Sequence, residues 1–273
     1  MKLADALEMV MRTDPGMIRS HNEDAIFADA GLGVAILADG MGGYNAGEVA
    51  SGLATTRLAE DIAGVINSPA VLGQGLSDAS VVEAHVVNEV KAANLAIFNA
   101  AQGCSQYTGM GTTLVLAWFY DNRMSVAHVG DSRLYRLRGE RFEQLTRDHS
   151  LLQEQLDNGI ITAEQARYAE NRNLVTRALG VDPEVEVEVH DFDVQPGDIV
   201  MLCSDGLNDM VEDDDIAETL LTLSANLPLA ADHLVHMTNA NGGRDNVSVI
   251  LVKVLGDFAS PRGWWQRLRA RFQ

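Results

Sequence analysis

The sequence predicts an α+β fold: a central β-sandwich of two mainly antiparallel sheets flanked by helix pairs, in α-β-β-α layers. Three observations favour it. Short apolar segments of strand length recur along the chain, separated by turn residues. Several are joined by short hairpins, which only antiparallel neighbours allow. Two pairs of segments with helical spacing interrupt them, and each pair is expected to cover the outer face of one sheet.

The first half of the chain alternates strands with one long helix pair. A turn at Pro15-Gly16 follows the first strand, and the Asp121-Asn122 pair is typical of a tight hairpin. The segment 33–38 is continuously apolar, as a strand buried on both faces should be. The expected strands are 9–12, 25–28, 33–38, 112–120 and 123–128, and the expected helices are 46–66 and 81–101.

The second half begins with a hairpin and returns to the same pattern after a polar insertion. Helical spacing is clearest near the end, where two amphipathic segments precede a last apolar strand. The expected strands are 132–137, 141–144, 184–190, 198–203 and 246–254; the expected helices are 151–158, 163–169, 213–223 and 227–240.

Length and composition indicate one domain over residues 1–255, followed by a basic aromatic tail at 256–273. The formal net charge of -19 argues against nucleic-acid binding, which needs basic surface. Two cysteines do not make a disulfide framework, and no apolar run is long enough to span a membrane. A cytoplasmic location is therefore expected.

Four short acidic motifs lie far apart in the chain, and each is expected where a strand meets a loop. They are 19–24, 39–43, 204–206 and 244–246. Carboxylates gathered from distant segments are costly unless a cation neutralises them. An all-oxygen cluster favours hard ions such as Mg²⁺ or Mn²⁺. The motifs therefore suggest a metal-assisted hydrolase that acts on phosphate.

Asp39 and Asp205 each end an apolar strand and precede a glycine. The glycine lets the backbone approach closely, so the Gly40 carbonyl is a candidate ligand. An Asp-Gly pair taken alone is equally typical of a turn, but its repetition favours a shared site. Asp131 and Asp245 also lie at strand ends, which converging sheets bring to one rim.

Arg19 lies close in sequence to Glu23 and Asp24. Its planar guanidinium is suited to hold phosphate oxygens through two parallel hydrogen bonds. The alternative is a structural ion pair with one of these two neighbouring acids, and the sequence leaves both open.

These motifs, taken together, resemble the metal-dependent serine/threonine protein phosphatases (protein phosphatase 2C class, PPM type), in particular the compact bacterial branch. The resemblance covers residues 9–254 in the family's order. It rests on Arg19, Asn22-Glu23-Asp24, Asp39-Gly40-Met41-Gly42-Gly43, Gly111-Thr112-Thr113, Val129-Gly130-Asp131-Ser132-Arg133, Asp148-His149-Ser150, Thr176-Arg177-Ala178-Leu179-Gly180, Ser204-Asp205-Gly206-Leu207 and Arg244-Asp245-Asn246.

The resemblance implies two or three Mn²⁺ or Mg²⁺ ions at one end of the sandwich. Asp39 is expected to bridge two ions, with Asp205 and Asp245 as ligands of the first and the Gly40 carbonyl as a ligand of the second. Other supporting groups are implied with them: Glu23 and Asp24 near the ions, Asp131 at a third site shared with Asp205, and Arg19 on the substrate phosphate.

The implied activity is hydrolysis of phosphoserine and phosphothreonine in proteins by metal-activated water, opposing bacterial serine/threonine kinases. Animal-type members carry a histidine after the Asp-Gly pair, whereas this chain has Met41, which donates no proton. His149 stays open either as a proton donor or as a structural residue. Two other functions stay open: a catalytically weak phosphoprotein-binding regulator, and a phosphohydrolase of a small phosphorylated metabolite.

The insertion at about 149–179 resembles the family's flap beside the active site, and its arginines are candidates for contact with phosphorylated substrates. The tail carries Trp264, Trp265 and Phe272 among arginines. It is expected either to contact a membrane surface or a partner, or to pack on its own domain. The chain is expected to be a monomer whose partners are phosphorylated proteins and a cognate serine/threonine kinase.

Overall fold

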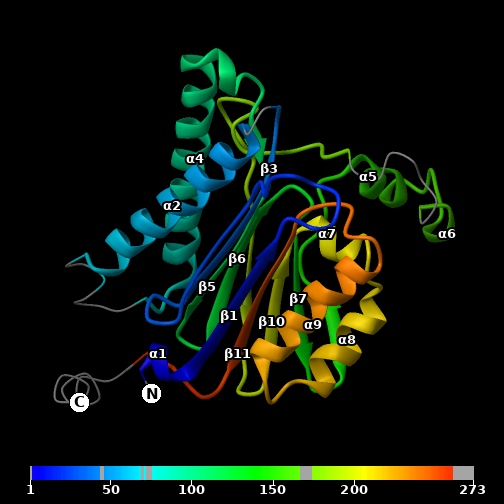
Figure 1. Ribbon diagram of the computed structural model, residues 1–273. Coiled ribbons are helices and arrows are strands. Elements are labelled where there is room, and N and C mark those ends of the chain that lie inside the picture. Colours follow the sequence, from blue (N-terminus) through cyan, green and yellow to red (C-terminus); the bar gives the residue numbers. More distant parts are fainter. Residues whose placement is uncertain (1, 44–45, 69–70, 72–75, 167–173, 261–273) are drawn as a thin grey trace.

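The structure is a computed structural model that describes residues 2–43, 46–68, 71, 76–166 and 174–260. Two antiparallel sheets lie face to face (Figure 1). The first has the order β1-β11-β10-β7-β8, formed by Leu7–Asp14, Val247–Val254, Ile199–Cys203, Arg133–Arg138 and Arg141–Gln144. The second has the order β2-β3-β5-β6-β9, formed by Asp24–Asp29, Val34–Met41, Leu114–Tyr120, Arg123–Val129 and Glu188–Asp193, with the short strand β4 (Gly111–Thr112) beside β3.

One helix pair covers the outer face of each sheet. α2 (Ala46–Ile66) and α4 (Ala79–Gly103) lie on the second sheet, and α8 (Asp213–Thr222) and α9 (Leu227–Ala240) lie on the first (Figure 1). The predicted α+β sandwich with α-β-β-α layers is confirmed. Of the described helices, none is long and apolar enough to cross a membrane.

The core has three layers because the central strands are buried on both faces. On β3, Val34 and Ile36 point toward α2 and α4, whereas Ala35 and Leu37 point between the sheets. This period of two is the ordinary alternation of a strand, and it explains why the segment is apolar without interruption. The same alternation places Asp39 on the inner face, at one end of the space between the sheets.

Most predicted elements are confirmed, several with the same bounds, such as α2 and α9. The predicted strand at 33–38 is too short, since β3 continues to Met41 and pairs there with β4. Asp39 therefore lies within a strand and not at a strand–loop junction. Two short helices were not predicted: α1 (Leu3–Ala6) and α7 (Asp205–Asn208).

The predicted strand at 184–190 begins too early, because β9 starts only at Glu188. Its partner strand limits it: Glu188 pairs with His128, and β6 ends one residue later, before the turn at Gly130. Residues just before β9 instead meet α4, where the Asn94 side chain donates hydrogen bonds to the carbonyls of Asp182 and Pro183.

The insertion carries α5 (Leu151–Asp157) and α6 (Ala163–Ala166), which project from the sandwich beside the end where β3 and α7 lie (Figure 1). Arg167 and Arg172 lie outside the described residues. The third arginine of the insertion, Arg177, forms an ion pair with Glu186.

The opposite end of the sandwich is closed by the β5–β6 turn, where Asp121 and Asn122 both have positive φ angles. Their side chains accept hydrogen bonds from the backbone amides of Ser260 and Phe258, respectively. The Phe258 side chain is buried in the inter-sheet core, so the first tail residues pack on the domain. Residues 261–273, which include the tryptophans of the tail, lie outside the described residues.

Candidate metal and phosphate site

The sequence-predicted site residues gather around one cavity at the end of the sandwich. The cavity has a volume of about 260 Å³ and draws its walls from both sheets and the insertion. Its lining residues are Arg19, Glu23, Asp39, Gly40, Met41, Gly42, Thr113, Asp131, Val175, Asp205, Asp245 and Asn246. Of the eight predicted residues, seven line this cavity, and the eighth, Asp24, lies opposite Asp39 in the neighbouring strand.

The β2–β3 ladder explains the position of the first two acids. Asp24 and Asp39 are directly opposite partners, so their side chains leave the sheet on the same face. The backbone of Asp39 is fixed by Thr113, whose hydroxyl accepts the Asp39 amide at 3.0 Å and whose amide donates to the Asp39 carbonyl at 2.8 Å. The Gly111-Thr112-Thr113 motif therefore orients a carboxylate from the adjoining segment.

The other sheet supplies Asp205 and Asp245. Asp205 is the first residue of α7, immediately after β10, and Asp245 precedes β11. The two sheets are joined at this point, because the Ser204 hydroxyl donates a hydrogen bond to Asp24 Oδ2 at 2.9 Å. Gly206 permits the close approach of α7 to β11, since a Cβ atom there would lie 2.0 Å from the Asn246 carbonyl oxygen.

Two carboxylate oxygens in this cluster lack a protein hydrogen-bond donor and are suited to coordinate a cation. Among the described residues, Asp24 Oδ1 and Asp205 Oδ1 are buried and have no hydrogen-bond partner. A buried carboxylate oxygen without a donor is costly, whereas a hard divalent ion is coordinated by oxygens of this kind. The donor set therefore fits Mg²⁺ or Mn²⁺.

The electrostatics of the cluster point the same way. Burial, followed by repulsion from Asp24 and Asp205, raises the pKa of Asp39 well above its ordinary value. Burial also raises the pKa of Asp24 to about 6, and burial with repulsion from Asp131 raises the pKa of Asp205. These neighbouring carboxyl groups resist ionisation in the protein without metal, and a bound divalent cation would stabilise their ionised form.

Gly40 lies where no side chain fits. A Cβ atom at Gly40 would lie 2.2 Å from the carbonyl oxygen of Gly47 in α2 and 2.6 Å from that of Glu23. A Cβ atom at Gly47 would in turn lie 2.7 Å from Glu23 Oε1. The start of α2 is thus packed directly against the acidic strand, and the glycines make this contact possible.

Asp131 follows a tight turn at the end of β6. Gly130 has a φ angle of +105°, and a Cβ atom there would contact the Thr113 side chain at 2.7 Å. Burial and repulsion from Asp148 raise the pKa of Asp131 to about 6. Asp131 and Asp205 also line a second, adjoining cavity of about 300 Å³ at the base of the insertion.

Arg19 is half exposed and lines the cavity. Its Nη2 atom donates to Asp245 Oδ2 at 2.7 Å. Of the two alternatives for Arg19, the structural pairing thus exists, but with Asp245 and not with the expected Glu23 or Asp24. In this position the Arg19 guanidinium lines the same cavity as the acidic residues, so it is also available to a phosphate group there.

Asn246 was named in the sequence only as part of a motif and not as a site residue, but in the structure it bonds to a distant loop. Its Oδ1 accepts the Glu23 amide, and its Nδ2 donates to the carbonyls of Pro15 and His21. The side chain is buried and holds the loop that carries Arg19. A polar residue between Asp245 and the last strand was the available signal. His149, by contrast, does not line this cavity.

The model of the family "Protein phosphatase 2C" matches residues 19–240. The serine/threonine phosphatase stp of Listeria welshimeri is 39% identical over 245 residues, which cover 89% of this chain and 94% of that protein. The catalytic domain of the serine/threonine protein phosphatase PstP, solved in complex with two manganese ions, has a TM-score of 0.80 and 36% identity. That comparison covers 91% of this chain and 98% of the solved chain.

The solved structure of the serine/threonine phosphatase Stp1 from Staphylococcus aureus has a TM-score of 0.83 and 34% identity, and covers 94% of this chain and 98% of that one. These relatives therefore match about nine tenths of the chain.

Proposed function

The chain belongs to the protein phosphatase 2C family and is a serine/threonine protein phosphatase, and we propose that the acidic cavity at the end of the sandwich is its catalytic centre. One observation carries this assignment. Asp39 from one sheet and Asp205 and Asp245 from the other line the same cavity, and the buried Asp205 Oδ1 has no hydrogen-bond partner among the described residues.

The proposed ligands are those that the family resemblance implies. Asp39, Asp205, Asp245 and the Gly40 carbonyl would hold two ions, with Asp39 shared between them. Glu23 and Asp24 would support the same ions, and Asp131 with Asp205 would hold a third. We propose two or three Mn²⁺ or Mg²⁺ ions in total; when bound, they activate water for attack on phosphorus and neutralise charge on the phosphoryl oxygens.

The other residues of the cavity bind the substrate phosphate or position the segments that carry the site. Arg19 binds the phosphate oxygens and orients the phosphoryl group toward the acids. Thr113 and Asn246 hold the two segments that carry Asp39 and Arg19. Met41 lines the cavity but has no proton to give, and we propose water held in the cavity as the source of the proton for the leaving oxygen.

The substrates are phosphorylated proteins, and we propose a cognate serine/threonine kinase as the opposing partner. The flap at about 149–179 is proposed to contact the protein part of the substrate, since its residue Val175 lines the same cavity as Arg19. We further propose a monomeric, cytoplasmic protein with one phosphatase domain at 1–255. The tail at 256–273 is proposed to provide a membrane-surface or partner contact.

The test measures hydrolysis of p-nitrophenyl phosphate and of a phosphothreonine peptide with Mn²⁺, Mg²⁺ or EDTA. Asp39→Asn and Asp205→Asn should each abolish metal-supported turnover, whereas Asp232→Asn, an exposed control on α9, should leave it unchanged. Unchanged turnover in either cavity variant would remove the proposed centre.

The same assay separates the other functions. Tight binding of the phosphopeptide with no turnover in any metal would favour a phosphoprotein-binding regulator. Turnover of small phosphorylated metabolites with no turnover of phosphopeptides would favour a metabolite phosphohydrolase.

A further inference from the structure

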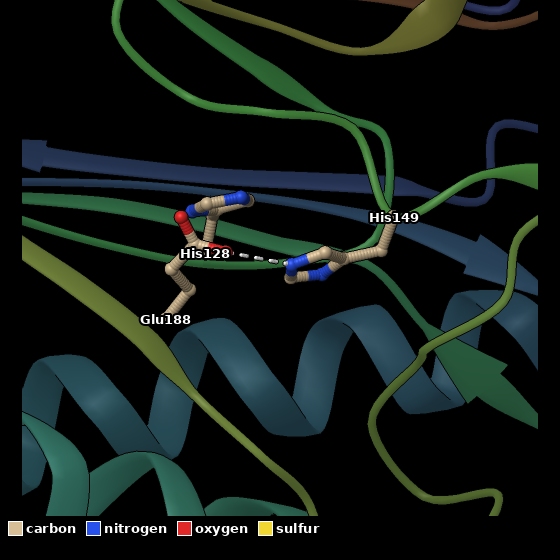
Figure 2. Close-up of side chains that lie close together, drawn as sticks. All are labelled: His128, His149 and Glu188. Atoms are coloured by element: carbon tan, nitrogen blue, oxygen red, sulfur yellow. Dashed lines mark hydrogen bonds and ion pairs between the residues drawn. The ribbon is translucent and has the colours of Figure 1, made fainter. Parts of the chain in front are cut away.

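A second cluster of metal-ligating side chains lies outside the acidic cavity, at the base of the insertion. It consists of His128 at the end of β6, His149 at the start of the insertion and Glu188 at the start of β9 (Figure 2). One candidate ligand atom from each residue lies within 4.8 Å of the other two. Both histidines are buried, whereas Glu188 is about one third exposed, which leaves a route from solvent.

The His128 ring is held in the manner of a metal ligand. Its Nε2 lies 2.8 Å from the Arg147 carbonyl oxygen, which only accepts, so Nε2 carries the proton. Nδ1 therefore has the lone pair, and it is buried without a hydrogen-bond partner among the described residues. The His128 side chain is only 1% exposed. Metal-binding histidines commonly donate their other ring N–H to a backbone carbonyl in this way.

We propose that His128, His149 and Glu188 bind a divalent ion of the zinc class, separate from the ions of the acidic cavity. Two imidazoles and one carboxylate suit Zn²⁺, Co²⁺ or Ni²⁺, whereas the all-oxygen cavity suits Mg²⁺ and Mn²⁺. Burial lowers the pKa of both histidines, which keeps them neutral and able to bind. The pKa of Glu188 is lowered by hydrogen bonds from His190 and His149 despite its partial burial, so it stays ionised.

Binding of this ion requires His149 to rearrange. Its Nδ1 now accepts the Gly130 amide at 3.1 Å, so its Nε2 carries the proton that faces Glu188 Oε2 at 3.2 Å (Figure 2). The two imidazole rings are stacked, with an angle of 14° between their planes. Because lone pairs lie in the ring planes, they converge on one ion only if the His149 ring turns and its proton moves from Nε2 to Nδ1.

That rearrangement breaks the hydrogen bond to the Gly130 amide, since Nδ1 then donates. Gly130 directly precedes Asp131, and the His149 amide is also bonded to the Gly130 carbonyl at 2.9 Å. Zinc at the histidine cluster is thus coupled to the loop that carries Asp131. The effect on turnover rests on the proposed role of Asp131, whereas the binding of zinc does not.

The first experiment measures zinc binding by the full-length protein in saturating Mg²⁺, which occupies the acidic cavity. The wild type should retain one zinc ion per chain after dialysis, and X-ray absorption should find two imidazole ligands. His149→Asn should lose this ion, although the Asn oxygen still accepts the Gly130 amide and maintains the fold. Glu188→Gln should weaken binding by about tenfold or more.

The matched control is His190→Gln, which changes an exposed histidine that is hydrogen-bonded to the same carboxylate at 2.8 Å. It should retain zinc like the wild type. Equal zinc retention in the wild type and His149→Asn, or no zinc retention in the wild type, would overturn the proposed site.

The second experiment measures Mg²⁺-supported turnover with added zinc. Zinc should inhibit the wild type and His190→Gln but inhibit His149→Asn much less. Zinc bound at one ion per chain without inhibition would remove the coupling to Asp131 and leave the site itself intact. Absence of turnover in every protein without zinc would count against the catalytic centre and not against the zinc site.

Discussion

Asp24 and Asp39 occupy directly opposite positions in the β2–β3 ladder and turn their carboxyl groups toward the same end of the sandwich. Opposite residues of an antiparallel pair have Cβ atoms about 4.5–5.5 Å apart, and like charges at that separation repel. The fold tolerates this pair because Ser204 satisfies one oxygen of Asp24 and a cation can satisfy the rest. The acidic end is therefore a source of instability in the metal-free protein.

The first prediction concerns the stability of the metal-free protein against pH. The folded-state pKa of Asp24 is raised to about 6 from an ordinary value of 3.8. The protonated Asp24 carboxyl group therefore stabilises the folded state fully below about pH 4, and this stabilisation is lost as pH rises through 6. Asp24→Asn should be more stable than the wild type at pH 7, by about 1–3 kcal/mol, and equally stable at pH 4.

Thermal unfolding in EDTA measures this difference at both pH values. Added Mn²⁺ should stabilise the wild type at pH 7 and have little effect at pH 4, where protons occupy the carboxylates. A wild type that is more stable than Asp24→Asn in EDTA at pH 7 would contradict the predicted repulsion.

The second prediction concerns Arg19. Arg19→Ala should lower kcat/KM for a phosphothreonine peptide by about 10- to 100-fold, as expected for the loss of a charge-assisted contact with phosphate. Inhibition by inorganic phosphate should weaken in parallel. The matched control is Arg12→Ala, which breaks an ion pair with Asp232; neither residue lines the cavity, so both constants should stay unchanged. Phosphate inhibition of equal strength in wild type and Arg19→Ala would rule out this contact.

The third prediction compares two glycines of α2. Gly47→Ala places a Cβ atom 2.8 Å from the Gly40 carbonyl carbon, so it should destabilise the protein by about 1–3 kcal/mol and reduce turnover. Gly52→Ala, in the same helix, meets nothing within 4 Å and should stabilise the protein by about 0.5–1 kcal/mol. Chemical denaturation with Mn²⁺ present measures both; similar shifts for the two variants would show that the close packing is absent.

The fourth prediction concerns the hydrogen bonds between the Asn246 side chain and the loop that carries Arg19. Asn246→Ala removes three hydrogen bonds to the loop of residues 15–23 and leaves buried backbone groups unpaired, so a loss of about 2–4 kcal/mol is expected. Hydrogen exchange of that loop should accelerate, and KM for the peptide should rise. Asn241→Ala, which removes one exposed hydrogen bond to the Met210 carbonyl, is the control and should change neither. Unaltered hydrogen exchange of the loop in Asn246→Ala would show that Asn246 does not hold it.

The layer order was predictable because it depends on periodicity, which the sequence displays directly. Helices α2 and α9 were predicted with their observed bounds, and the turn at Asp121-Asn122 was identified by residue type alone. Strand ends were less predictable, because they depend on the partner. β9 begins at Glu188 only because β6 stops soon after His128.

The candidate site was predicted as a set of residues but not as a set of contacts. Repeated Asp-Gly pairs identified Asp39 and Asp205, whereas the partner of Arg19 depends on the approach of two loops more than two hundred residues apart in sequence. The histidine cluster was missed for the same reason. Its members are distant in sequence, and only the β6–β9 register brings His128 opposite Glu188.

The anchoring of Phe258 and Ser260 at the β5–β6 turn separates the two ends of the molecule. β6 runs from this turn to Val129, two residues before Asp131, so Ser260 lies roughly 20 Å or more from the acidic cavity, the length of a seven-residue strand. A fluorescent protein or surface linker joined directly after Ser260 would therefore be attached at the end of the sandwich opposite the acidic cavity. A protein immobilised in this way would expose the acidic cavity to the surrounding medium, which suits single-molecule measurements of substrate binding.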